Sequence, residues 1–332
     1  MKTPSVEKYG SLAGHRAFLG LPPKKGSVEP FPCRPADVYR RQTQGLARRL
    51  KAIGCRNVVI GLSGGLDSAL ALLVAVGAFR RLRIPFEGIH AVTMPGFGTT
   101  GRTRGNAELL CEGLGLGLET VSIVKACRQH FRDIGHDGRT PDVTFENAQA
   151  RMRTMILMDK ANMLGGIVLG TGDMSEIALG WCTFNGDHMA MFSVNNGVPK
   201  TVVRKVCSWW AQSHPGNAAD AVMDIVATPV SPELVKGQRT EAAIGPYELH
   251  DFFLWNFIMN EMGSGDLRSA AERRFAGVYT APEISAALAT FMRRFFTQAF
   301  KRNCQCDGVK VFPFELSPHG WWIPSDLGPV RI

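Results

Sequence analysis

Glycines, serines and an aspartate are concentrated in one short stretch, SGGLDS, which begins at Ser63. Gly64 and Gly65 lack the Cβ atoms that would keep an anion away from the backbone amides. The hydroxyls of Ser63 and Ser68 are further donors to a phosphate. The carboxylate of Asp67 does not suit bare phosphate, but it suits a Mg²⁺ ion bound to that phosphate. No lysine follows the glycines, so the stretch is not a GxxxxGK[ST] loop.

The residues on either side of this stretch predict a strand before it and a helix after it. Residues 58–60 are an uninterrupted β-branched run, typical of a strand that is buried on both faces. Residues 69–76 are small and apolar, which favours a helix. The turn would thus end at a helix N-terminus, where free N–H groups and the helix dipole attract phosphate. An ordinary turn between strand and helix is the alternative.

Two more polar loops follow predicted strands. A strand over residues 89–94 leads to a loop rich in Thr and Arg, and a strand over 166–169 leads to GTGDMSE. With a third strand over 121–124, this rhythm predicts an α/β fold, a doubly wound parallel sheet. Ligands of such sheets bind beyond the carboxyl ends of the strands, so we expect the three loops to converge on one ligand.

Helical spacing predicts the other elements. The first 30 residues are rich in Gly, Pro and Lys and predict an extended arm or linker, and from Lys200 onward the chain is mostly helical. A Pro-containing loop is expected over 228–238, and an irregular end after 303. The predicted helices span residues 37–53, 106–113, 143–164, 202–212, 218–226, 251–262 and 281–300.

Composition indicates a globular chain of 332 residues with a formal net charge of +9. Its basic residues occur in short groups, typical of solvated helix faces, so we expect polyanionic small molecules rather than nucleic acid as partners. The 8 cysteines contain no CxxC pair, which predicts reduced thiols, no zinc and a cytoplasmic protein. Neither an apolar run of about 18 residues nor a signal peptide is present, so no membrane association is expected.

SGGLDS resembles the pyrophosphate loop of the ATP pyrophosphatases, which adenylate a carbonyl oxygen. Four further motifs, in order, resemble those of the NAD synthetase family. They are DVTFENAQARMR from Asp142, VLGTGDMSEIALGWCTFNGDHMAMFSVNNGVPKTVV from Val168, GQRTEAAIGPYELHDF from Gly237, and FKR from Phe300. The resemblance covers about residues 31–328 and is closest to the synthetase portion of the glutamine-dependent type.

This resemblance implies a Rossmann-like fold of the adenine nucleotide alpha hydrolase type with a helical C-terminal part. It divides the chain into an arm (1–30), a synthetase domain (31–328) and a tail (329–332). The implied reaction is ATP-dependent amidation of deamido-NAD to NAD. ATP adenylates the nicotinate carboxylate and releases pyrophosphate, and ammonia then displaces AMP. Other ATP pyrophosphatases, such as tRNA-modifying ligases, and a non-catalytic nucleotide-binding regulator are the alternatives.

The resemblance also assigns residue roles. Asp67, Lys200 and Asp187 are expected to be catalytic, and Asp67 and Glu176 to bind Mg²⁺, the expected cofactor. The residues expected to bind ATP are Gly61, Leu62, Ser63, Gly64, Gly65, Leu66, Asp67, Ser68, Thr171, Lys200 and Ser231. The residues expected to bind deamido-NAD are Asn147, Glu176, Trp181, Cys182, Thr183, Phe184 and Lys301. Trp181 and Phe184 also fit plain core aromatics, and Asn147 and Lys301 also fit a solvated helix surface.

One feature departs from the glutamine-dependent pattern. These enzymes carry a nitrilase-like glutaminase domain before the synthetase, whereas about 30 residues precede the match here. We therefore expect that the chain uses free ammonia, that a separate glutaminase protein supplies it, or that the chain is a fragment. The family also implies a homodimer, with the predicted helices over 143–164 and 202–212 as candidate contacts.

Overall fold

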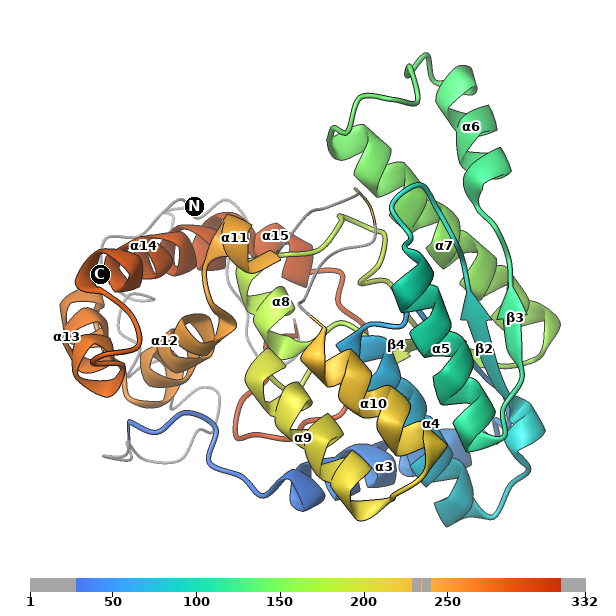
Figure 1. The fold of residues 1–332 in the computed structure, drawn as a ribbon, viewed down its shortest axis with the longest axis horizontal. Helices are drawn as coiled ribbons and strands as arrows, with labels where there is room; N and C mark the ends of the chain where they lie inside the picture. The colour runs from blue at the N-terminus through green and yellow to red at the C-terminus, as the bar shows by residue number, and fades with distance from the viewer. Residues whose placement is uncertain (1–27, 229–233, 235–239, 318–332) are drawn as a thin grey trace, which may run out of the picture.

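The computed structural model describes residues 28–228, 234 and 240–317, and it contains a parallel sheet of five strands, which lies in the right half of Figure 1. The strand order is β3-β2-β1-β4-β5, and all pairs are parallel. The strands are β1 (Val58–Gly61), β2 (Ile89–Thr93), β3 (Leu118–Thr120), β4 (Ile167–Gly170) and β5 (Phe192–Ser193). The strand order reverses between β1 and β4, where open α/β sheets bind ligands. The predicted fold class is confirmed.

Helices cover both faces of the sheet because alternate side chains of a strand point to opposite faces. Val58 and Ile60 of β1 belong to one buried core, and Val59 between them belongs to a second. The first core includes residues of α3 (Pro35–Ala52), α4 (Leu66–Leu82), α5 (Gly101–Leu114), α9 (Lys200–Ser213) and α10 (Asn217–Ala227). The second includes residues of α6 (Val124–Asp133) and α7 (Val143–Met163).

The C-terminal part is helical, as predicted, and lies beside the sheet, at the left of Figure 1. It is rich in aromatic side chains; Phe252 and Phe291, for example, belong to the same core as Val58. The helical part therefore shares a core with the sheet. Its helices are α11 (Thr240–Ile244), α12 (Tyr247–Met259), α13 (Ser264–Arg274), α14 (Ala281–Thr297) and α15 (Ala299–Arg302). The remaining helices are α8 (Met174–Leu179) and the 3-10 helix η1 (Phe86–Gly88).

Some element predictions were wrong. The third strand ends at Thr120, before the predicted span over 121–124, because the apolar residues there lead into α6. The helix α5 begins at Gly101 rather than at 106, since the Thr100 hydroxyl accepts a hydrogen bond from the Thr103 N–H and caps it. The predictions made no mention of α6, α8, α11, α13 or β5. The predicted arm up to residue 27, nearly all of the predicted loop over 228–238, and the tail from 318 onward lie outside the described residues.

Two further observations concern the cysteines and the length of the helices. All of its cysteines are free thiols. In the part of the chain that the structure describes, no helix is both long enough and apolar enough to cross a membrane.

Candidate active site

The glycine turn after β1 is held by its own serines. Ser63 Oγ lies 3.1 Å from Ser68 Oγ and accepts a hydrogen bond of 3.1 Å from the Gly65 N–H. Ser68 Oγ donates to the Gly65 carbonyl at 3.0 Å. Gly65 is the N-cap of α4, so the turn delivers the chain directly to a helix N-terminus. The predicted order of strand, glycine turn and helix is confirmed.

Gly64 is required by a close backbone approach. Its φ of +81° is in the left-handed region, and a Cβ atom at this position would lie 1.9 Å from the carbonyl oxygen of Thr103. The glycine turn therefore packs directly against the first turns of α5. This contact brings the Thr/Arg stretch to the same edge of the sheet as SGGLDS, as predicted.

The second loop lies after β4 and leads into α8. Asp173 caps α8, because its Oδ1 accepts from the Glu176 N–H at 2.9 Å while the Glu176 carboxylate accepts from the Asp173 N–H. The side chain of Asn195 joins this loop to the glycine turn. Its Nδ2 donates to the carbonyls of Asp67 at 2.9 Å and Thr171 at 3.0 Å.

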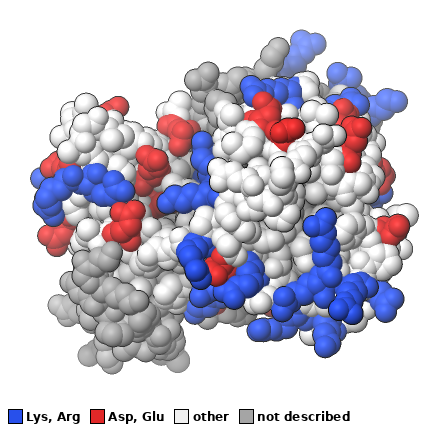
Figure 2. All heavy atoms as spheres, turned by 60° about the horizontal axis from the view of Figure 1, so that its bottom comes forward, with Lys and Arg blue, Asp and Glu red and all other residues white. Residues whose placement is uncertain are grey.

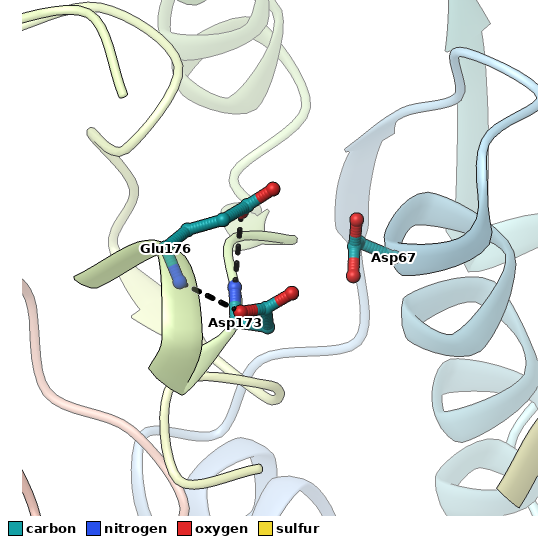
Figure 3. Close-up of side chains that lie close together, drawn as sticks. All are labelled: Asp67, Asp173 and Glu176. Carbon is teal, nitrogen blue, oxygen red and sulfur yellow. Dashed lines mark hydrogen bonds between the residues drawn. The ribbon is translucent and has the colours of Figure 1, made fainter. Parts of the chain in front are cut away.

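Three carboxylates from the two loops converge on one lysine. Figure 3 shows Asp67 at the start of α4 facing Asp173 and Glu176 at the start of α8. The Nζ atom of Lys200 lies 2.6 Å from Asp67, 2.7 Å from Asp173 and 2.9 Å from Glu176. The Lys200 side chain is 2% exposed and that of Asp173 is 0% exposed. We call Asp67, Asp173 and Glu176 the carboxylate cluster.

Burial dominates the electrostatics of this cluster. Loss of hydration raises the pKa of Asp173, and it raises that of Glu176 to about 7, while the charge of Lys200 opposes both shifts. For Lys200, burial disfavours the ammonium form, but the surrounding carboxylates outweigh it and raise the pKa of this lysine. When all three carboxylates are ionised, the cluster has more negative charge than one ammonium offsets, which favours binding of another cation.

A network behind the cluster positions Lys200, the first residue of α9. The Lys200 N–H donates to Ser175 Oγ at 2.8 Å, and Ser175 Oγ in turn donates to the buried carboxylate of Asp251. The other oxygen of Asp251 accepts from the N–H of Thr201 at 3.0 Å and from its hydroxyl at 2.7 Å. A carboxylate of α12 therefore caps the start of α9.

A cavity of about 570 Å³ opens in front of the glycine turn and the carboxylate cluster; we call it the main cavity. Its volume suits ligands the size of nucleotides. The predicted site residues that line it are Gly61, Leu62, Ser63, Gly64, Gly65, Leu66, Asp67, Ser68, Asn147, Thr171, Glu176, Trp181, Cys182, Thr183, Phe184, Asp187 and Lys301. The buried ammonium of Lys200 joins them through the carboxylate cluster. Ser231 lies outside the described residues.

The far wall of the main cavity combines aromatic and basic side chains. Lys301 Nζ donates to the carbonyls of Gly180 at 3.0 Å and Cys182 at 2.7 Å. The guanidinium carbon of Arg294 lies 5.0 Å from the ring centre of Trp181, and its Nε donates to Leu179 at 2.9 Å. Burial lowers the pKa of both basic groups. This wall is suited to an aromatic ring and an anion.

Asp187 lies at the edge of the same wall. Its Oδ1 accepts from the N–H of Thr183 at 2.9 Å and from the Thr183 hydroxyl at 2.6 Å. These bonds hold the predicted catalytic carboxylate in place.

Sequence reasoning missed Asp173, Asn195, Asp251 and Arg294. For Asp173 a signal existed, because it lies inside GTGDMSE three residues before Glu176, which is a capping-box spacing.

Comparisons with known proteins agree with this geometry. The sequence model of the NAD synthase family matches residues 38–273. The glutamine-dependent NAD(+) synthetase of Mycobacterium leprae is 38% identical over 344 aligned positions, which cover 90% of this chain and 50% of that protein. The chain thus spans about half the length of the curated relatives it matches.

Solved structures give similar results. The NMN synthetase of Francisella tularensis has a TM-score of 0.58 and 26% identity, covering 69% of this chain and 94% of that one. The NH3-dependent NAD synthetase of Campylobacter jejuni has a TM-score of 0.57 and 21% identity, covering 81% and 96%. The second likeness shows a shared fold.

Proposed function

The chain belongs to the NAD synthase family, and from this premise we propose that it is a ligase that amidates deamido-NAD to NAD. ATP supplies the driving force: the nicotinate carboxylate attacks the α-phosphorus, and pyrophosphate leaves. Ammonia then attacks the acyl adenylate, and AMP leaves. An amide forms slowly from a free carboxylate because oxide is a poor leaving group, so adenylation is the step that makes the reaction feasible.

The observation that carries this proposal is the convergence of the glycine turn and the carboxylate cluster on one cavity. In the proposal, backbone amides and hydroxyls of residues 61–68 bind the ATP phosphates, and Thr171 makes a further contact with ATP. Lys200 stabilises the negative charge on the leaving pyrophosphate. The other wall, with Asn147 and residues 181–184, binds deamido-NAD, and Lys301 is close to its phosphates. Asp187 lies near the nicotinate group.

The carboxylate cluster fits Mg²⁺, the cofactor we propose. One carboxylate oxygen from each of its three members lies within 4.8 Å of the others. Asp67 Oδ1 is buried and accepts no hydrogen bond among the described residues. Carboxylate oxygens are the ligands that Mg²⁺ prefers. Asp67 and Glu176 would hold the ion, which would neutralise phosphate charge and polarise the scissile bond.

Ammonia is the proposed nitrogen donor, either free in solution or released by a separate glutaminase protein. The test uses the purified chain with ATP, Mg²⁺ and deamido-NAD, and compares ammonium with glutamine. We expect equal amounts of NAD and pyrophosphate with ammonium, and none with glutamine alone. Because NH₃ is the nucleophile, the rate at fixed total ammonium should rise with pH until another group titrates. Absence of pyrophosphate release would contradict the proposal.

A second candidate reaction is amidation of nicotinate mononucleotide. It is favoured by the likeness to a structure described as an NMN synthetase, 94% of which this chain covers. The relative that covers more of this chain, at higher identity, is described as an NAD(+) synthetase. The same assay with each nucleotide separates the two, and a higher kcat/KM for the mononucleotide would favour the second candidate.

We further propose how the protein is organised. Its chain divides into an arm (1–30), the synthetase domain (31–328) and a tail (329–332). The protein is located in the cytoplasm and acts as a homodimer. Of the two helices considered for the dimer contact, α9 has its apolar side in the core. By contrast, α7 leaves Met155 52% exposed and Met163 83% exposed, so α7 is the proposed contact.

A further inference from the structure

A second, much smaller hollow adjoins the main cavity. Its volume is about 20 Å³, enough for one molecule the size of water or ammonia. We call it the small hollow. Gly170, Gly172, Glu176, Cys182 and Asp187 line both spaces. A molecule in the small hollow is therefore next to the carboxylates of the substrate cavity.

His188 lines the small hollow and has a buried acceptor atom. The residue is 7% exposed, and its Nδ1 lies 2.8 Å from the carbonyl oxygen of Thr183. Because a carbonyl oxygen only accepts, Nδ1 carries a proton, and in the neutral form of the ring Nε2 then has a free lone pair. Nε2 is buried and has no hydrogen-bond partner within the described ranges 28–228, 234 and 240–317.

Gln305 lines the same space and has a buried donor atom. Its amide Nε2 is also buried without a hydrogen-bond partner among the residues that the structure places. The lining thus contains acceptors, among them His188 Nε2 and the carboxylates of Glu176 and Asp187, and donors, among them the Gln305 amide. A metal cation offers nothing to the amide N–H. Ammonia combines N–H donors with a lone pair, so it offers a partner to both kinds of group.

We propose that the small hollow binds the ammonia that attacks the acyl adenylate, and that His188 and Gln305 are its binding residues. The identity of the ligand rests on the proposed function. In the step itself, a C–N bond forms at the nicotinate carbonyl carbon and the C–O bond to AMP breaks. The AMP phosphate keeps the electron pair of that bond, and one proton is released from the nitrogen. Neither residue has to change its covalent state.

A binding experiment tests this without turnover. The chain is labelled with ¹⁵N-histidine, and the His188 resonances are identified by their absence from a His188→Leu variant. We expect ammonium chloride to shift the Nε2 resonance of His188 in a saturable way, and potassium chloride to leave it unchanged. A resonance that responds to neither salt, or equally to both, would overturn the proposal. Because no substrate is present, failure of the proposed reaction would not affect this result.

A kinetic experiment tests the same residues in the working enzyme. In His188→Leu and Gln305→Leu we expect the KM for ammonium to rise on the order of tenfold, the equivalent of one lost hydrogen bond. The KM values for ATP and deamido-NAD should not change. His130→Leu is the matched control, because His130 is exposed on α6. If all KM values rise together, or none does in a folded variant, the proposal is wrong.

The size of the small hollow gives a third test. Methylamine needs more room than ammonia, so the wild-type chain should form less N-methyl amide from it than amide from ammonia. In His188→Ala the space is larger, and we expect the ratio of methylamide to amide to rise. Mass spectrometry of the dinucleotide product measures this ratio. An unchanged ratio would mean that the attacking amine does not pass through the small hollow.

Discussion

At the scale of single residues, the site places like charges close together, and only a cation can offset the repulsion between them. The carboxylates of Asp67, Asp173 and Glu176 surround one ammonium, and the charge of Asp67 contributes to the raised pKa of both other acids. Such an arrangement lowers the stability of the folded chain unless cations compensate it. A site of this kind is therefore better explained by binding of a metal–phosphate group than by structural need.

Asp67→Asn tests this explanation. The amide cannot hold Mg²⁺ on the phosphates, so we expect kcat/KM to fall by about 10²-fold or more. The variant should unfold at the wild-type temperature or slightly higher, because one like charge leaves the cluster. Asp220→Asn on the exposed surface of α10 is the control and should have wild-type activity. A folded Asp67→Asn variant with unchanged turnover would refute the metal role.

Gly64→Ala tests the geometry of the phosphate turn. The added methyl would lie 1.9 Å from the Thr103 carbonyl oxygen at a φ of +81°, so the turn or α5 must shift. We expect a loss of roughly 1–3 kcal/mol in stability and a much higher KM for ATP. Thermal unfolding and initial rates measure both. Gly101→Ala, where the added methyl meets nothing within 4 Å, should change neither; a wild-type-like Gly64→Ala would contradict the described packing.

Much of the candidate site was predictable at this scale because its residues lie in dense local motifs. SGGLDS and GTGDMSE both lie at the main cavity, together with Asn147, Asp187 and Lys301. Asn195 and Asp251 were not predictable. Their roles depend on hydrogen bonds to residues far away in the chain, such as the bond from Asn195 to Asp67 across 128 positions. Sequence spacing contains no signal for such contacts.

At the scale of elements, apolar runs predicted buried strands well and exposed strands poorly. The strands β1 and β4 consist almost entirely of buried apolar residues, and both were predicted to within one residue at each end. By contrast, β3 has the exposed residues Glu119 and Thr120, and β5 is two residues long, so neither has a clear pattern. The short helix α8 was not predicted because its 6 residues are too few to show a helical pattern, so that only its capping residues mark it in the sequence.

The connection between α11 and α12 should make the stability of the folded chain sensitive to acid. His250 is buried, and its Nε2 lies 2.7 Å from the carbonyl oxygen of Ile244. Burial, with a contribution from the charge of Arg294, lowers the pKa of His250 to about 4. Below its usual pKa of 6.5 the unfolded chain therefore binds a proton that the folded chain does not. Stability should fall as the pH falls from about 6.5 to about 4, by up to about 3 kcal/mol.

Chemical denaturation across this pH range measures the effect. In His250→Gln, whose side chain still donates to Ile244 but does not titrate, this part of the pH dependence should disappear. If the wild type and His250→Gln show parallel pH profiles, the histidine does not account for the acid sensitivity.

At the scale of the whole molecule, charge and exposed apolar surface are unevenly distributed. Figure 2 shows one face, on which Lys and Arg side chains lie in several separate groups. The net charge of +9 fits a protein that handles polyanionic nucleotides.

Large apolar side chains are exposed on α7, which also lines the main cavity through Asn147. An interface on α7 would therefore lie beside the main cavity.

Met155→Asp tests the proposed homodimer. A charge at an exposed position normally changes monomer stability by less than about 0.5 kcal/mol, but it is costly inside an apolar interface. We expect a dimer for the wild type by light scattering and dissociation for Met155→Asp. Val278→Asp is the control, since Val278 is 64% exposed and lies beyond α7. A fully active wild-type monomer would rule out the homodimer.

In the proposed reaction, this chain adenylates the nicotinate carboxylate of deamido-NAD before ammonia attacks. The most direct test starts from deamido-NAD with ¹⁸O in that carboxylate, together with ATP, Mg²⁺ and ammonium. Adenylation places one carboxylate oxygen between the acyl carbon and the phosphorus, so attack by ammonia must leave ¹⁸O in AMP. Mass spectrometry should find one ¹⁸O in AMP and none in pyrophosphate. Product NAD accompanied by unlabelled AMP, or by label in released phosphate, would show that the carboxylate is not adenylated.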